Sequence, residues 1–229
     1  LLSSRAMCHM MDVLPSSPAA LVHYDAVPLF CERLLSIEYI DLAEQALQAL
    51  EKLSHEHPLP ILRAGGMQAV LQYVDFFATG VQVTGAIPAQ FGAILRKYSD
   101  PASPLGVQRL AVSTAANLCR HLPVECAHLV ADAVPLMTNL LSHHDQRVLE
   151  HTCVGFSRLV DAFTHSADTL ETLAAHGLLP NIVRLLGGMV SDADARASRL
   201  SGGGDAPVTL SDGTYTMLLK MSANICRGS

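Results

Sequence analysis

The chain has 229 residues, of which 50% are apolar and 16% are charged, and its formal net charge is −6. This composition is too apolar for a disordered chain, and Lys and Arg form no dense cluster of the kind that binds nucleic acid. Charged residues or prolines interrupt every apolar run before it reaches the roughly 18 residues that a membrane-spanning helix needs. We therefore expect a folded domain with no nucleic-acid and no membrane partner.

Two kinds of apolar phrase alternate along the chain. The shorter kind reads DAVPLFCERLL, AGGMQAVLQYV, DAVPLMTNLL and AHGLLPNIVRLL (25–35, 64–74, 132–141 and 175–186). The longer kind follows each copy and reads AEQALQALEKLS, RLAVSTAANLCRH, HTCVGFSRLVDAF and TYTMLLKMSANICRG (43–54, 109–121, 151–163 and 214–228). Apolar residues at helical spacing, with almost no alternation of β-branched residues, predict an all-α fold.

The recurrence of these phrases predicts a stacked array of repeats. Equivalent positions return about every 40 residues, which is the period of armadillo and HEAT units built from two or three helices. Pro28, Pro135 and Pro180 lie near the starts of second helices, where a missing N–H costs nothing. Gly65 and Gly177 fall in the turns between first and second helices. We expect an armadillo-type right-handed α-solenoid, with an ordinary helical bundle as the alternative.

The array is expected to form a single domain over residues 1–229. We predict repeats at approximately 16–54, 58–121, 124–164 and 167–227, preceded by a truncated third helix at 1–15. Both ends of the chain fall within this pattern, so we interpret the chain as a fragment of a longer protein.

Two segments interrupt the repeats, both between a second and a third helix. Residues 83–108 break the second repeat, and copies of Gly-Val-Gln at both ends of the break indicate either a surface insertion or a translated intron. Residues 187–213 break the fourth repeat and are rich in Gly, Ser and Asp, as in a flexible loop.

Aligned by their endings, the third helices predict a peptide-binding groove on the concave side of the array. In armadillo arrays these helices line the inner groove, where an asparagine amide can both donate to and accept from an extended peptide. One aligned column contains Lys52, Asn117, Arg158 and Asn224; one turn earlier come Gln48, Ser113, Val154 and Lys220, and three residues later His55, Arg120, Asp161 and Arg227. The predicted groove residues are Gln48, Lys52, Ser113, Asn117, Arg120, Arg158, Lys220, Asn224 and Arg227.

A simpler interpretation of the asparagines remains open. Asn117 and Asn224 could satisfy neighbouring backbone groups or cap helix ends instead of binding a peptide. The chain contains no Trp, whereas nuclear-import adaptors hold lysines between tryptophans one turn before the asparagine. We therefore do not expect this array to bind basic nuclear-localisation signals.

The sequence shows no motif for catalysis, a cofactor or a metal. The six cysteines form no CxxC pair, and most fall within helical phrases, which is typical of free buried thiols in a reducing compartment, here the cytoplasm or the nucleus. Cys119, His121, Cys126 and His128 are zinc-ligand types in a short stretch, but Cys119 lies within an apolar helix. Core cysteines and surface histidines are thus the preferred interpretation.

The amino-acid sequence of the repeats resembles that of a known family. The segments 10–77, 108–123 and 128–163, with phrases such as IDLAEQALQALEKLS and QRLAVSTAANLCRHLP, are similar to the armadillo region of HECT-type E3 ubiquitin ligases of the ubiquitin-fusion-degradation class. That class includes the thyroid-receptor-interacting ligase of animals and KAKTUS of plants.

The resemblance implies a scaffold that recognises protein substrates or ubiquitin. In this family the catalytic cysteine lies in a C-terminal HECT lobe, through which an E2 would also bind, and no cysteine of this chain matches it. A stand-alone armadillo adaptor without catalysis is the alternative.

Overall fold

The computed structural model describes residues 2–36, 39–82, 103–120, 122–187 and 210–228, and in these ranges every regular element is a helix. Residues 178–187 are also helical. The named elements are α1 (Leu2–Val13), α2 (Ser17–His23), α3 (Ala26–Leu35), α4 (Ile40–Ser54), α5 (Pro58–Arg63), α6 (Gly66–Gln82), α8 (Ser103–Leu118), η1 (Val124–Cys126), α9 (His128–Ala131), α10 (Val134–Leu140), α11 (Gln146–Ala162), α12 (Ala167–Ala175) and α14 (Asp212–Gly228).

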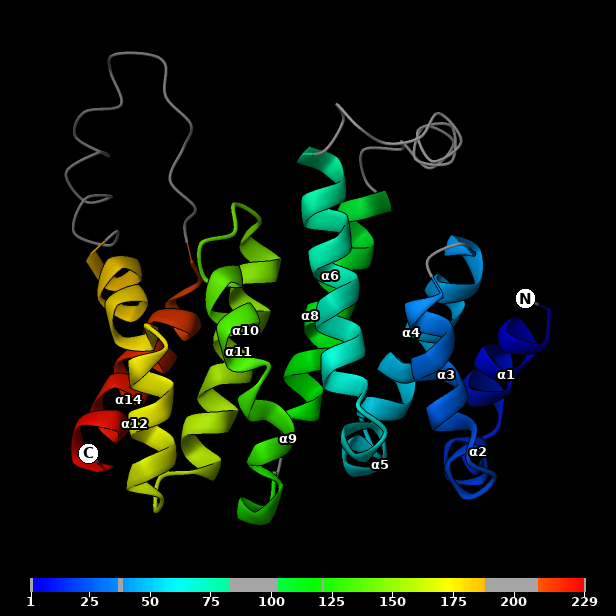
Figure 1. Cartoon of the computed structure of the whole chain (residues 1–229), viewed down its shortest axis with the longest axis horizontal. Helices are drawn as coiled ribbons and strands as arrows, with labels where there is room; N and C mark the ends of the chain where they lie inside the picture. The colour runs from blue at the N-terminus through cyan, green and yellow to red at the C-terminus, as the bar shows by residue number, and fades with distance from the viewer. Residues whose placement is uncertain (1, 37–38, 83–102, 121, 188–209, 229) are drawn as a thin grey trace.

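The helices form units of three that stack along one direction. Each unit has a short first helix (α2, α5, α9 or α12), a second helix (α3, α6, α10 or residues 178–187) and a long third helix (α4, α8, α11 or α14). Successive third helices pack on one another in chain order, from α1 through α4, α8 and α11 to α14. Figure 1 shows the units side by side, with the two chain ends at opposite ends of the array. The predicted all-α solenoid is confirmed.

A residue in the left-handed conformation reverses the chain between first and second helices. Asp25, Gly65 and Gly177 occupy this place in three of the units, with φ of 53°, 75° and 85°. Glycine adopts this conformation without steric cost, which explains its presence at two of these turns. At the next position, a Cβ added to Gly66 would lie 2.8 Å from the carbonyl oxygen of Ile61. The tight turn therefore also requires the second glycine.

The third helices α4, α8 and α11 are buried on a wide stripe because each packs between two other helices of the same layer. On α4 the side chains of Ala43, Ala46, Leu47, Ala49, Leu50 and Leu53 are all 0% exposed. Small residues let the helices approach closely: a Cβ added to Gly155 on α11 would lie 3.5 Å from the Cα of Ala116 on α8. Burial of this extent, at about 25 cal/mol per Å² of apolar surface, makes the inter-helix contacts the main source of stability.

The helix boundaries differ from the predicted interruptions of the repeats. The second helix α6 extends to Gln82, well past the end of its predicted phrase, and α8 begins at Ser103. Residues 103–108 thus belong to the third helix and not to the insertion, because a proline in the first helical turn supports a helix start and one exposed glycine does not stop it. Likewise α14 already begins at Asp212. The remainder of the two interruptions, residues 83–102 and 188–209, lies outside the described residues.

Candidate protein-binding surface

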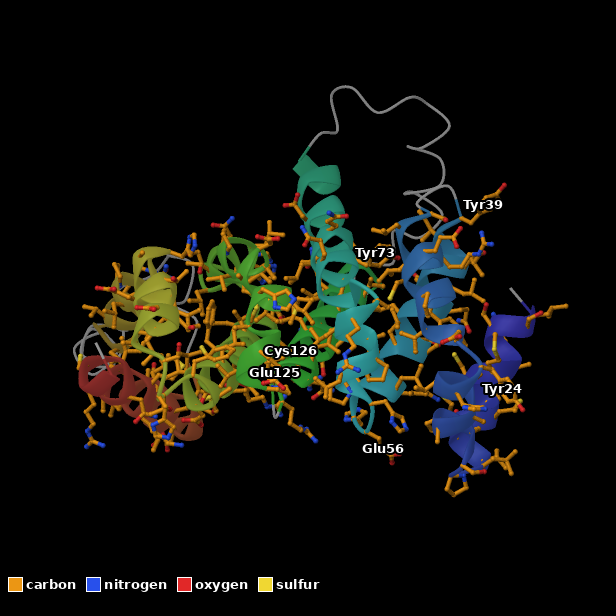
Figure 2. All side chains as sticks on the ribbon, turned by 60° about the horizontal axis from the view of Figure 1, so that its bottom comes forward. Tyr24, Tyr39, Glu56, Tyr73, Glu125 and Cys126 are labelled. Carbon is orange, nitrogen blue, oxygen red and sulfur yellow. The ribbon has the colours of Figure 1, made fainter. Side chains whose placement is uncertain are left out.

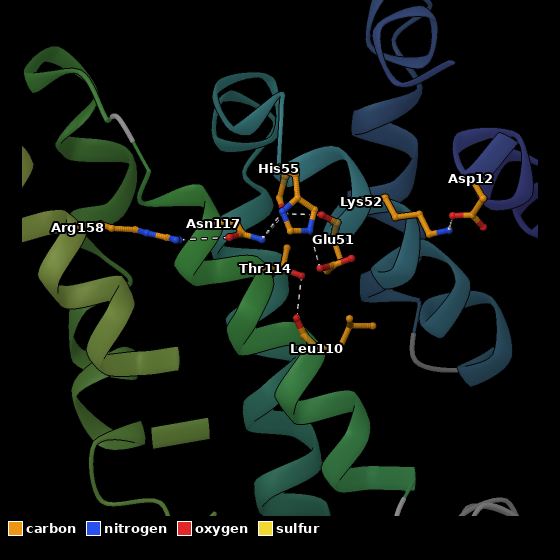
Figure 3. A network of polar contacts seen from close by, with 9 residues as sticks. Asp12, Glu51, Lys52, His55, Leu110, Thr114, Asn117 and Arg158 are labelled. Carbon is orange, nitrogen blue, oxygen red and sulfur yellow. Dashed lines mark hydrogen bonds and ion pairs between the residues drawn. The ribbon is translucent and has the colours of Figure 1, made fainter. Parts of the chain in front are cut away.

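Eight of the nine predicted groove residues lie on α4, α8, α11 and α14, the layer of stacked third helices, and Arg120 follows the end of α8. We call the nine residues the third-helix surface. They differ in accessibility. Gln48, Lys220 and Arg227 are exposed, Asn117 is buried, and the others are half-buried: Lys52, Ser113, Arg120, Arg158 and Asn224. Five of them bind residues of adjacent third helices: Lys52, Asn117, Arg158, Lys220 and Asn224. Figure 3 shows these contacts for α4, α8 and α11.

Asn117 is held inside a network and is only 5% exposed. Its Nδ2 donates to Oγ of Ser54 at 3.1 Å and lies 3.5 Å from Nδ1 of His55. Its Oδ1 accepts from Nη1 of Arg158 at 3.3 Å (Figure 3). A peptide backbone would have to displace these bonds to reach the amide. The simpler interpretation, in which asparagine satisfies neighbouring groups, therefore describes Asn117, although its partners are mainly side chains.

A regular pattern underlies these contacts. Each third helix contributes one residue to the aligned column that contains Asn117. That residue lies against the preceding third helix, at the residue three places after the column residue of that helix. Lys52 pairs with Asp12 in this way, and Asn117 contacts His55 (Figure 3). We call this series of contacts the inter-repeat ladder.

The last step of the ladder repeats the same chemistry. Nδ2 of Asn224 donates to Oδ1 of Asp161 at 3.1 Å, and Nζ of Lys220 approaches Oδ2 of the same carboxylate at 3.2 Å. Asp12, which the sequence reasoning missed, occupies the place of Asp161, since each follows two apolar residues at the end of a third helix. This alignment was the signal that could have identified it.

One step of the ladder joins two positive charges. The column residue Arg158 faces Arg120, close enough that the charge of Arg120, after the larger effect of burial, lowers the pKa of Arg158. Nη1 of Arg158 donates to the carbonyl oxygen of Ala116 at 2.5 Å, in the last turn of α8. A cation at this position compensates the helix dipole and a carbonyl without an intrahelical partner. Among the described residues, neither guanidinium forms an ion pair with a carboxylate.

A second link between α8 and α11, also missed in the sequence, involves Asp145. Nη2 and Nε of Arg109 bind its two carboxylate oxygens at 2.6 and 3.0 Å. Its Oδ1 also accepts from the backbone N–H of Val148 at 3.0 Å and so caps the start of α11. The hydrogen bond from Arg109 is the main reason that the pKa of Asp145 falls to about 2. An aspartate directly before an apolar helical phrase was the available signal.

Comparison with known proteins points to one group of enzymes. A family model described as "E3 ubiquitin-protein ligase TRIP12-like, TPR repeats" matches residues 1–63. The chain is 43% identical over 229 residues to the E3 ubiquitin-protein ligase UPL3 of Arabidopsis thaliana, covering 100% of the chain and 10% of that protein. It is 36% identical over 224 residues to the E3 ubiquitin-protein ligase TRIP12 of Danio rerio, covering 98% of the chain and 9% of that protein. It is 26% identical over 183 residues to ubiquitin fusion degradation protein 4 of Saccharomyces cerevisiae, covering 80% and 10%.

The chain is homologous to a segment of these E3 ubiquitin-protein ligases. This agrees with the resemblance noted in the repeated phrases, and the chain spans about a tenth of the length of these relatives. The crystal structure of an engineered protein shares the fold, with a TM-score of 0.62 at 16% identity over 99% of this chain and 44% of that one. Although the family model is described by TPR repeats, the units of this chain contain three helices, as in armadillo arrays.

Three buried cysteines of this chain lack the environment of a nucleophile. Burial raises the pKa of Cys119 and of Cys153 to about 12, and that of Cys31 to about 11. A thiol must ionise to attack, so these groups are inert at neutral pH. All six cysteines are free; five are buried and Cys226 is exposed. This agrees with the prediction of mostly buried thiols.

The described residues bring no metal-binding group together and contain no membrane-spanning helix. Within them, no three His, Cys, Asp or Glu side chains lie close enough to hold a metal ion, and His121 of the weighed Cys/His set falls outside them. No described helix combines the length and apolar content needed to cross a bilayer.

An apolar pocket of about 180 Å³ lies between α9, α10, α11 and α12, with Asp168 and Thr172 among its lining residues. It contains none of the nine residues of the third-helix surface.

Proposed function

We propose that this chain is a recognition scaffold within an E3 ubiquitin ligase and that its third-helix surface binds a protein segment, either of a substrate or of ubiquitin. The observation that carries the proposal is the homology over the whole chain to E3 ubiquitin-protein ligases. A stack of repeats presents one extended surface instead of a catalytic pocket, and such surfaces serve in binding.

Exposed polar side chains support the choice of the third-helix layer. Gln48 on α4 and Arg227 on α14 are exposed and have no hydrogen-bond or ion-pair partner among the described residues. Their donors and acceptors are available to a partner, whereas Asn117 and Asn224 support the ladder. The recognition surface is thus proposed to consist of exposed residues arranged over a ladder that fixes the spacing of the helices.

The thiols of this segment indicate which steps of ubiquitin ligation it does not perform. Its buried thiols are poor nucleophiles, so the transfer of ubiquitin and the binding of an E2 are assigned to other parts of the ligase. A reducing compartment, the cytoplasm or the nucleus, suits its free thiols.

Site-specific photocrosslinking tests the location of the binding surface. A benzoylphenylalanine placed at Gln48 is expected to crosslink to ubiquitin or to a ubiquitin–reporter fusion when either protein is mixed with the chain and irradiated. The matched control carries the same group at Glu171, an exposed position on the first helix α12. Equal yields from both positions, or no product from Gln48 with either protein, would contradict the proposed surface.

A further inference from the structure

The like-charged step of the inter-repeat ladder is the exception in an otherwise complementary series. Lys52 is matched with Asp12, and Asn224 with Asp161. At the equivalent place Nη1 of Arg158 binds the carbonyl oxygen of Ala116 and Oδ1 of Asn117. The backbone N–H of Arg120 donates to the carbonyl oxygen of Asn117, so both arginines lie at the end of α8. Two adjacent cations repel each other, and the repulsion is strongest where burial reduces the access of water. Apart from the carbonyl end of α8, no described group compensates this step, which leaves net positive charge between α8 and α11.

The surrounding carboxylates are already engaged by other groups. Asp161, one turn further along α11, binds Lys220 and Asn224. Glu51, on the other side of Asn117, binds Nε2 of His55 at 2.9 Å. Neither is paired with a guanidinium of the like-charged step, so both half-exposed guanidiniums stay open to a carboxylate of a partner.

The two arginines have unused donors for such a group. A guanidinium offers five N–H donors in a planar fork that matches a carboxylate. Arg158 uses one nitrogen, Nη1, for its bonds to α8, and the guanidinium of Arg120 makes no hydrogen bond within the described part of the chain. The positive charge of Arg158 also reaches His151, whose pKa it helps to lower after the larger effect of burial.

We propose that Arg120 and Arg158 together bind a carboxylate side chain, from Asp or Glu, of the protein segment recognised on the third-helix surface. The proposal rests on the function proposed above and makes it more specific: the segment is acidic at the point where it crosses from α8 to α11. A carboxylate placed there would restore the alternation of charge that the rest of the ladder shows.

Binding of labelled peptides to the whole chain tests this inference. The probe is a fluorescein-labelled twelve-residue peptide of alternating Glu and Ser, and the reference probe has Gln in place of Glu. Fluorescence anisotropy at low ionic strength is expected to show binding of the acidic probe and at least about fivefold weaker binding of the neutral one.

Three variants assign the effect to the arginine pair. Arg120→Gln removes one guanidinium without breaking a hydrogen bond of the fold and is expected to weaken binding about five- to tenfold. Arg158→Lys keeps the charge but loses the fork and is expected to give a smaller loss. Arg33→Gln makes the same charge change at an exposed position in the last turn of α3 and is expected to have no effect.

The outcomes separate this inference from the proposed function. Equal affinity of the wild-type chain and the Arg120→Gln variant for the acidic probe would overturn the arginine site. So would an equal loss in the Arg33→Gln control, which would indicate a nonspecific effect of net charge. If the photoprobe at Gln48 still crosslinks to its partner in the Arg120→Gln background with full yield, the recognition surface stands and the arginine site alone is refuted.

Discussion

Asn117 is expected to be the most costly polar position on the third-helix surface. Its replacement by alanine removes the 3.1 Å bond to Ser54 and the 3.3 Å bond from Arg158. A hydrogen bond contributes about 1 kcal/mol net, and more with a charged partner, so Asn117→Ala should lower the free energy of unfolding by about 2–3 kcal/mol. The loss is not larger because the hydroxyl of Ser54 keeps a partner: its Oγ still donates to the carbonyl oxygen of Glu51 at 2.6 Å.

Asn224→Ala is the matched control for this prediction. Asn224 lies in the same column but is half-buried, and its partner Asp161 keeps Lys220 after the substitution. The expected loss is therefore about 0.5 kcal/mol or less. Both variants would be compared with the wild-type chain by urea denaturation followed by circular dichroism. If the two losses differ by less than about 0.5 kcal/mol, the argument that Asn117 supports the stack by buried hydrogen bonds is wrong.

Four further substitutions probe other features of the fold. Asp145→Ala should cost about 2 kcal/mol at neutral pH, since it removes a helix cap and the pair with Arg109. Because folding lowers the pKa of Asp145 from 3.8 to about 2, this contribution is present above pH 3.8 and is lost as the pH falls toward 2. Urea unfolding of both proteins at neutral and at acidic pH checks it, and a difference independent of pH would refute it. Gly66→Ala should destabilise the chain by about 1–3 kcal/mol because its Cβ would clash, whereas Gly106→Ala, in α8 with open space around it, should stabilise by about 0.5–1 kcal/mol. Differential scanning calorimetry should place their melting temperatures on opposite sides of the wild-type value. Ellman's reagent should react rapidly with one thiol of the folded chain, and Cys226→Ser should abolish that reaction; rapid labelling of the variant would contradict the burial of the other five.

The architecture was predictable because the hydrophobic pattern repeats at helical spacing. The phrase 43–54 became α4 with only its first turn added, since apolar burial is a local consequence of periodicity. The start of α8 was missed because the second copy of Gly-Val-Gln suggested the end of the interruption, although the proline before it favours the first turn of a helix.

The arrangement of the site was less predictable, because it depends on neighbours distant in sequence. The column containing Asn117 was correctly assigned to one layer of third helices. Whether its amide faces solvent or an adjacent helix depends on Ser54 and Arg158, which belong to other repeats. A single-helix pattern contains no information about such partners, so it could not show that the amide of Asn117 bonds to two adjacent helices.

The position of Asn117 in the ladder also affects how cooperatively the repeats unfold. Its side chain bonds to the helix before it, through Ser54, and to the helix after it, through Arg158. In a stack where each repeat contacts only its neighbours, stability is a sum of local terms, and a weakened interface splits the array into blocks that unfold separately. Loss of this amide would therefore weaken both interfaces of α8 at once, while the apolar contacts of the stack remain. The backbone amides of α8 would then exchange with solvent faster than they do in the wild-type chain.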